Sequence, residues 1–293
     1  MTWTVYLPLL LPALVALAAR RLAERARPRA AVLGLVTASV LTAATSVWSL
    51  LLLVLTLFDD LPAMEALNSR SGMHLPEPVP DWVATTASVV LAACLINLAR
   101  DVHLRRSTVR RLRDAGPDAD GVVVADWAEP LAVAVPGRPG QVLLTTGMLK
   151  VLDADERRAV LAHERAHLTH RHHVAVLLAG GAAAVNPLLR PARDAVTYLV
   201  ERWADEEAAT SLGNRDLVAR AVARAALATK QPAPALGVHG GVIVRRVKAL
   251  HRPAPTTARW QLALPAAAVI ACLALEANAT LDFVAVLRAW LIG

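Results

Sequence analysis

The sequence predicts a mainly α-helical protein that crosses a membrane about four times and carries a small α+β domain between its third and fourth spans. Three observations support this fold class. The chain is 56% hydrophobic but only 4% aromatic, and a soluble domain rarely needs so much apolar content. Long uncharged segments are separated by charged segments, two of which are rich in arginine. Short β-branched runs and capped helical patterns follow the third uncharged segment.

Four apolar segments are candidate membrane spans. A helix needs roughly 20 apolar residues to cross the hydrocarbon core, so the second segment is long, and the first and fourth are near the lower limit. The first three belong to an N-terminal membrane region over 1–113, and the fourth to a C-terminal span and tail over 259–293. Whether the fourth span continues past Glu276 stays open. The segments are residues 5–19, 30–58, 82–99 and 260–275.

The distribution of arginine predicts the orientation of these spans. Residues 20–29 contain five arginines, whereas residues 59–81 contain one arginine and five acidic residues. Because arginine and lysine favour the cytoplasmic side, the N-terminus and 59–81 are expected outside and residues 100 to about 258 in the cytoplasm. The predicted location is the cell membrane. Aromatic rings prefer span ends, where the sequence places Trp3, Trp82 and Trp260.

Other classes of protein fit the composition less well. Positive charge precedes the apolar run of a cleaved signal peptide, but here it follows the first segment. The net charge of +7 arises largely from arginines beside the spans, where they meet anionic lipid. No nucleic-acid recognition pattern accompanies this charge, so direct nucleic-acid binding is not expected. Cys94 and Cys272 both fall in proposed spans and form neither a metal pair nor a disulfide framework.

Residues 114–258 are long enough for one small cytoplasmic domain, and its first part has the pattern of a sheet. Three short runs are β-branched and separated by turn residues, which predicts two or three strands. These runs are residues 121–127, 131–137 and 141–147.

Helical patterns follow the strands. Residues 152–170 predict a helix in which Asp153 suits the N-cap and Glu156 completes a capping box. Residues 174–185 are apolar but too short to cross a membrane, so they are expected to pack in the core or touch the membrane. Three further elements are predicted: a helix opened by Pro191 and closed by Gly213, a helix over 214–229, and a Pro- and Gly-rich loop over 230–240.

Five histidines lie within eleven positions, at His163, His167, His170, His172 and His173. His163 and His167 are four residues apart and share a helix face, so their imidazoles can converge on one zinc ion. His170 falls on the same face but about 10 Å farther along the axis than His163. All three therefore cannot meet at one ion, and a third ligand must come from elsewhere.

Two sources for the third ligand can be compared. His173 would complete the pattern H-E-x-x-H-x-x-G-x-x-H, but His170 replaces the glycine that lets such a chain turn sharply. That pattern also uses a downstream methionine turn, and no methionine follows Met148. The favoured source is Glu201 on a second helix, which completes a two-histidine, one-glutamate site with an open fourth position.

The helix that carries Glu201 also offers a supporting acid. Asp205 lies one turn beyond Glu201 on a face of small residues that allows a close helix approach. It is placed to accept the free N–H of a ligand histidine, which fixes the tautomer of that histidine. Glu206 and Glu207 turn away from this face and are expected to be solvated.

Glu164 is the one carboxylate between His163 and His167. In an H-E-x-x-H helix this residue is the general base for the attacking water, while a metal ion polarises the scissile carbonyl. The pattern predicts a peptide-bond hydrolase with one zinc ion per chain, held by His163, His167 and Glu201. The remaining histidines are expected at the cytoplasmic face beside Arg171: His170, His172 and His173.

These residues resemble the integral-membrane zinc peptidases of the beta-lactam-sensing antirepressor type (BlaR/MecR type), relatives of the HtpX-like and CAAX prenyl endopeptidases. The resemblance implies a gluzincin-like metallopeptidase domain in which His163, His167 and Glu201 bind zinc, Glu164 is the acid/base and Asp205 supports a ligand. Arg246 matches a late arginine of the family, in a substrate-contacting or structural role. The resemblance spans roughly residues 120–250, with motifs at 143–173, 186–187, 201–205 and 245–250.

One departure changes what the resemblance implies. Antirepressors that sense beta-lactams carry an extracellular penicillin-binding domain after the last span, and this sequence ends at Gly293, so direct drug sensing is not expected. By resemblance, the substrate is a cytoplasmic protein such as a transcriptional repressor, in signal transduction. The alternatives are quality control of membrane proteins, as in HtpX-like peptidases, and a metal-binding regulator without turnover. The expected partners are a protein or peptide substrate and the lipid bilayer.

Overall fold

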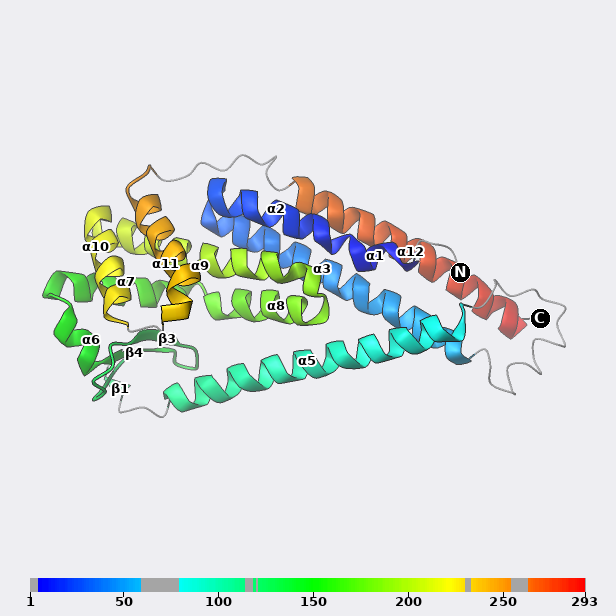
Figure 1. Cartoon of the computed structure of the whole chain (residues 1–293), viewed down its shortest axis with the longest axis horizontal. Helices are drawn as coiled ribbons and strands as arrows, with labels where there is room; N and C mark the ends of the chain where they lie inside the picture. The colour runs from blue at the N-terminus through cyan, green and yellow to red at the C-terminus, as the bar shows by residue number, and fades with distance from the viewer. Residues whose placement is uncertain are drawn as a thin grey trace.

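The computed structural model describes residues 5–58, 79–113, 118–119, 121–229, 233–253 and 263–292. The protein is mostly helical with one small sheet, as the sequence predicts. Figure 1 shows an elongated molecule in which the sheet and several short helices occupy one end, while the long helices extend to the other.

Three helices in the described part of the chain are long and apolar enough to cross a membrane. They correspond to the second, third and fourth predicted spans, and the last of them continues past Glu276. The predicted positions of Trp3, Trp260 and residues 59–78 lie outside the described residues. The three helices are α3 (Pro28–Leu55), α5 (Asp81–Arg113) and α12 (Ala263–Ile292), the last over Ala263–Val284.

The first predicted span, residues 5–19, is broken into α1 (Leu7–Leu10) and α2 (Pro12–Arg25), and neither helix qualifies by length. The break occurs because Pro12 has no N–H to donate to the carbonyl of Pro8. Ser46 of α3 supplies the missing donor, with its Oγ 3.0 Å from Pro8 O. Side-chain hydroxyls satisfy freed carbonyls in this way in membrane helices. The count of four spans stays a prediction.

The helices α8 (His172–Val185) and α9 (Arg190–Leu212) form a hairpin that packs against α2 and α3 (Figure 1). Residues 174–185 were predicted to pack in the core or touch the membrane, and the structure shows core packing for one face of α8, whose buried residues share one apolar core with α2, α3, α9 and α12. Asn186 begins the connecting turn η3 (Pro187–Leu189). Its Nδ2 donates to Leu9 O at 3.1 Å and to Ser46 Oγ at 3.0 Å, so the tip of the hairpin is fixed to α1 and α3.

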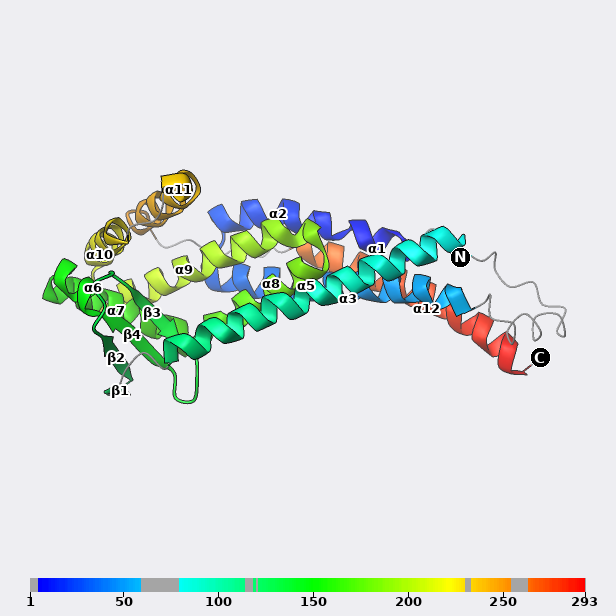
Figure 2. The ribbon, with the colours of Figure 1, turned by 60° about the horizontal axis from the view of Figure 1, so that its bottom comes forward.

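The sheet has the strand order β1-β2-β4-β3. β2 and β4 are parallel, whereas β1 and β3 pair antiparallel with their neighbours. Two or three strands were predicted, and each of the three predicted runs contains one, whereas the two-residue β1 was not predicted. Figure 2 shows α5 extending from the sheet along the long helices, and Val109 and Leu112 of α5 pack on the sheet. The strands are β1 (Asp118–Ala119), β2 (Val122–Ala125), β3 (Ala132–Val135) and β4 (Gln141–Thr145).

The helix that carries the histidines, α7 (Ala154–Thr169), begins at the predicted capping box. The backbone N–H of Glu156 donates to Asp153 Oδ1 at 2.8 Å, and the backbone N–H of Asp153 donates to Glu156 Oε2 at 3.1 Å. These bonds satisfy donors that have no partner inside the helix. The local sequence therefore determines where α7 begins.

The remaining helices follow the predicted order with one correction. Gly213 ends α9 with φ 63°, and α10 (Arg215–Ala228) follows. The loop predicted over 230–240 is wrong from Ala233 onward, because α11 (Ala233–Leu250) begins there. Pro234 falls in the first turn of α11, where a missing N–H breaks no helical bond. Proline near the start of a helix was thus mistaken for a sign of a loop.

The junction between β4 and α6 (Thr146–Val151) is tightly packed. Thr145 Oγ donates to Glu129 O at 2.7 Å and accepts from the N–H of Leu131 at 2.9 Å. A Cβ added to Gly147 would lie 2.2 Å from the carbonyl oxygen of Ala128. Backbone therefore occupies the space that any larger residue at position 147 would need.

We expect Gly147→Ala to destabilise the protein by about 1–3 kcal/mol, because overpacking against backbone has that typical cost. The measurement is the thermal unfolding midpoint of the purified protein in detergent. Gly241→Ala is the matched control, since a Cβ at Gly241 of α11 meets nothing within 4 Å. An equal loss in both variants would contradict the packing argument.

Candidate metal centre

Two helices bring the predicted metal ligands together. His163 and His167 lie one turn apart on α7, and Glu201 lies on α9, which packs against α7. Buried small residues of α9, including Ala204 and Ala208, allow the close approach. Among the described residues, His163, His167 and Glu201 form a group whose candidate ligand atoms all lie within 4.8 Å of one another.

The three candidate ligand residues form a triangle, in which the two oxygens of Glu201 each face a different histidine. His163 Nε2 and His167 Nε2 are 3.1 Å apart. Glu201 completes the triangle, with Oε2 3.5 Å from His163 Nε2 and Oε1 3.5 Å from His167 Nε2. A tetrahedral ion with ligand bonds near 2.0–2.1 Å separates its ligand atoms by about 3.4 Å. The spacing and the two-nitrogen, one-oxygen donor set therefore fit a zinc ion.

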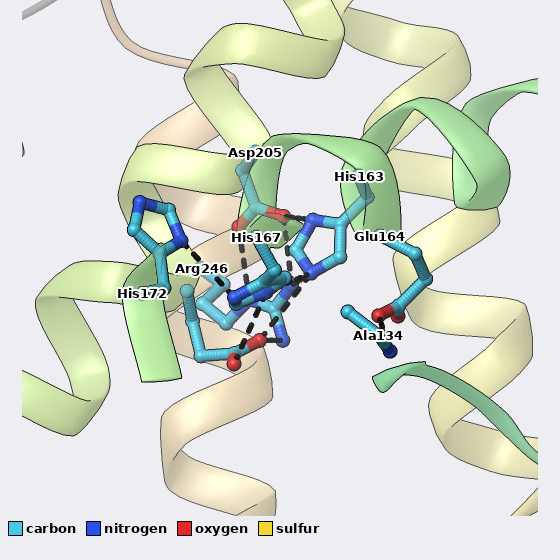
Figure 3. A network of polar contacts seen from close by, with 8 residues as sticks. Ala134, His163, Glu164, His167, His172, Asp205 and Arg246 are labelled. Atoms are coloured by element: carbon cyan, nitrogen blue, oxygen red, sulfur yellow. Dashed lines mark hydrogen bonds and ion pairs between the residues drawn. The ribbon is translucent and has the colours of Figure 1, made fainter. Parts of the chain in front are cut away.

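Asp205 and Arg246 surround the Glu201 and His163 side of this triangle. Asp205 Oδ1 lies 3.0 Å from Nδ1 of His163, on the opposite side of the ring from Nε2 (Figure 3). Arg246 of α11 donates to both oxygens of Asp205, at 2.8 and 2.7 Å. Its Nη1 also lies 2.8 Å from Glu201 Oε2. The guanidinium therefore holds both α9 carboxylates in fixed positions beside the histidines.

His167 has a different neighbour at its outer nitrogen. Nδ1 of His172, the first residue of α8, lies 3.0 Å from Nδ1 of His167. The two rings meet edge to face, with centroids 4.8 Å apart. Figure 3 shows His172 beside His167 and Asp205 beside His163. Each of the two histidines on α7 therefore has one nitrogen facing the triangle and the other facing a separate polar side chain.

Glu164 occupies the position next to this group, on the side of the sheet. Its Oε2 accepts the backbone N–H of Ala134 in β3 at 2.7 Å (Figure 3). Burial raises the pKa of this carboxyl group above its ordinary value, against the opposing charge of His163. Glu164 is therefore a carboxylate with raised proton affinity. It lies between the metal group, which consists of the three residues of the triangle, and the edge strand β3.

The electrostatics of the site favour positive charge within the triangle. Burial lowers the pKa of His163, but the hydrogen bonds and charges of Asp205 and Glu201 outweigh burial and raise it to about 10. Burial lowers the pKa of His167 to about 4. For Glu201, burial raises the pKa, but Arg246 and His163 outweigh burial and lower it. Without a metal ion, protonated His163 and Arg246 balance the carboxylates of Glu201 and Asp205, and a divalent cation bound in the triangle would take the place of the His163 proton.

Two side chains near the site differ from the sequence expectation. His172 was expected at the cytoplasmic face but is buried, with 1% of its surface exposed, because the chain turns back after α7. Glu206 was expected to be solvated but forms a bidentate pair with Arg215 at 2.6 and 2.9 Å. Glu207 is half exposed and His173 is exposed, as expected.

A cavity of about 1660 Å³ adjoins the metal group. Its walls include α3, α5, α8 and β3, and it reaches His163, Glu164 and His167. Apolar side chains such as Leu98 of α5 and Val176 of α8 line much of it. The site is therefore accessible from a space between the long helices and the sheet.

The comparison with known proteins covers the part of the site that lies on α7. Residues 98–189, which are 92 of the 293 residues, match the sequence model of peptidase family M48. The match includes His163, Glu164 and His167, whereas Glu201, Asp205 and Arg246 lie beyond it. No curated protein and no solved structure gave a match to the chain. This part of the chain, with the motif on α7, is therefore similar to the M48 metallopeptidases.

Proposed function

We propose that the protein is a membrane-embedded, zinc-dependent endopeptidase. The observation that carries this proposal is the triangle of His163, His167 and Glu201 beside Glu164. Two histidines and one glutamate with an open fourth position are the ligand set of catalytic zinc sites. A metal site with a purely structural role would not need a carboxylate of raised pKa next to it.

The proposed roles follow from the positions of the side chains. Bound zinc would polarise the scissile carbonyl and lower the pKa of water. Glu164 would take a proton from the attacking water and deliver it to the leaving amine, a task for which a raised pKa is suited. Asp205 and Arg246 would act as positioning residues, because their contacts orient His163 and Glu201.

The sheet would present the substrate to Glu164. β3 is an edge strand of the sheet as described, and the N–H of Ala134 points away from β4 toward Glu164. An extended peptide that pairs with the free edge of a strand gains main-chain hydrogen bonds there. We therefore propose that the scissile segment lies along β3 in an extended conformation, with its carbonyl near the metal group.

The substrate class follows in part from the resemblance and in part from the cavity. We propose a cytoplasmic protein, such as a transcriptional repressor, as the substrate, with the site facing the cytoplasm. The apolar walls contributed by α5 and α8 favour a second candidate function, the cleavage of membrane proteins in quality control. A cavity lined by such residues accepts apolar side chains better than charged ones.

We expect the purified protein to hold one zinc ion per chain, measured by elemental analysis. His163→Ala and Glu201→Gln should each reduce the zinc content, because each removes a ligand or its charge. His173→Ala is the matched control, since His173 belongs to the same histidine-rich segment but is exposed. Loss of zinc in His173→Ala together with full zinc content in His163→Ala would show that the ligand choice is wrong.

We expect Glu164→Gln to abolish cleavage while zinc stays bound. The amide has nearly the same shape but cannot accept the proton, and loss of a general base costs about 100- to 10,000-fold in rate. The measurement compares peptides released in membranes that carry the wild-type protein or the variant, by mass spectrometry. Glu207→Gln, the same change on a half-exposed residue, should cleave normally. Wild-type cleavage by zinc-loaded Glu164→Gln would favour a metal-binding regulator without turnover.

We expect the site to face the cytoplasm and residues 59–81 to face outside. The measurement is labelling of intact cells with an impermeant thiol reagent, in a background without Cys94 and Cys272. A cysteine within 59–78 should react, and a cysteine at Arg158, an exposed position of α7, should react only after the cells are permeabilised. The reverse result would overturn the topology and with it the cytoplasmic substrate.

A further inference from the structure

His172 is a buried polar residue that the proposed chemistry leaves without a role. It is 1% exposed, although it lies in a segment of histidines and arginines that a sequence would place at the surface. Its ring packs against Trp203 of α9, with centroids 4.7 Å apart. Nδ1 faces Nδ1 of His167 at 3.0 Å. Nε2 has no hydrogen-bond partner among the residues that the structure describes.

The backbone places His172 there through an unusual conformation. Arg171, between α7 and α8, has φ 50° and ψ 44° and is the one non-glycine residue with positive φ in the described part of the chain. This left-handed conformation is unfavourable for a residue with a Cβ and persists where the surroundings demand it. It reverses the chain within the two residues that separate α7 from α8. The His172 ring thereby returns to the side of His167.

The contact between the two nitrogens has a defined direction once His167 binds a metal ion. Nε2 of His167 faces Glu201 and His163, and a nitrogen that binds a metal carries no proton. Nδ1 of His167 must then carry the ring proton and donate it. His172 Nδ1 must be the acceptor, so the proton of the neutral His172 ring lies on Nε2.

We propose that His172 is a positioning residue for His167. Its Nδ1 accepts a hydrogen bond from His167 Nδ1–H and so fixes the tautomer and the ring orientation in which Nε2 points at the metal. Outer hydrogen-bond partners act on metal-binding histidines in this way. Asp205 has the corresponding position at His163. The two ligands would thus be supported unequally, one by a carboxylate and the other by a neutral imidazole.

The surrounding histidines do not share this geometry. His170 Nε2 lies 3.4 Å from Glu207 Oε2, and the His170 ring stacks on Trp203. His173, the next residue of α8, is exposed. Trp203 therefore packs against the rings of both His170 and His172, but only His172 reaches a nitrogen of a proposed ligand.

The inference rests on the proposed metal centre and is tested by zinc affinity, without any substrate. Metal-free protein in detergent is titrated with zinc against a chromophoric chelator. His172→Phe keeps a ring against Trp203 but removes the acceptor, and we expect it to weaken zinc binding about 10- to 100-fold. His172→Asn places an amide oxygen near the position of Nδ1 and should restore most of the affinity. His173→Asn, the matched control, should bind zinc as the wild type does.

The outcomes of the zinc titration separate the role of His172 from the existence of the metal centre. Equal affinity in the wild type and His172→Phe would overturn the role of His172 and leave the metal centre intact. Equal loss in the Phe and Asn variants would also overturn it, because the acceptor would not matter. A wild-type protein that binds no zinc would overturn the metal centre, and this inference with it.

A measurement on the wild-type protein tests the role of His172 even when a variant does not fold. Nitrogen-15 NMR of histidine-labelled, zinc-loaded protein distinguishes a protonated ring nitrogen from an unprotonated one. We expect His172 to carry its proton on Nε2 and His167 to carry its proton on Nδ1. A proton on Nδ1 of His172 would overturn the proposal.

Discussion

The bridge that Arg246 makes between Asp205 and Glu201 is the interaction on which the geometry of the site depends. Asp205 is 2% exposed and Arg246 13% exposed in their side chains, so neither charge is well solvated. A buried charge without a partner is strongly destabilising, and here each has one. Because Arg246 lies on α11 and both carboxylates lie on α9, the pairing also fixes α11 against the helix that faces α7. Glu201 is thereby held with one carboxylate oxygen 3.5 Å from each of the two histidines.

Sequence reasoning placed the local features correctly. The capping box at Asp153 determines where α7 begins, and the four-residue spacing places His163 and His167 on one face regardless of the rest of the fold. It also anticipated that Glu201 and Asp205 of a second helix meet these histidines, but it missed other tertiary contacts. No pattern around Arg246 indicates which carboxylates it meets, and α11 begins in a segment whose prolines and glycines suggested a loop. The position of His172 depends on a left-handed residue at Arg171, where no glycine marks the turn.

The long apolar helices show the same contrast between local and tertiary information. Uncharged runs identified α3, α5 and α12, because length and composition suffice for that inference. The break at Pro12 could be anticipated from proline itself, but its compensation by Ser46 requires a neighbouring helix. Glu276 shows the same dependence, since an acid within a span needs a partner and Ser49 of α3 donates to it. The sequence of a segment indicates that it forms a helix. The neighbouring helices determine whether that helix tolerates a proline or an acidic residue.

The shared core of α2, α3, α8 and α9 has a practical consequence for preparing this protein. Although a boundary near residue 114 looks like a place to cut, α8, η3 and α9 bury Ala179, Leu189 and Leu199 against the preceding helices. A soluble fragment that begins after α5 would expose those faces to water and lose the anchors that hold Asn186. Extended apolar surface of this kind promotes aggregation. Biochemistry on the metal group therefore requires the intact chain in detergent or lipid.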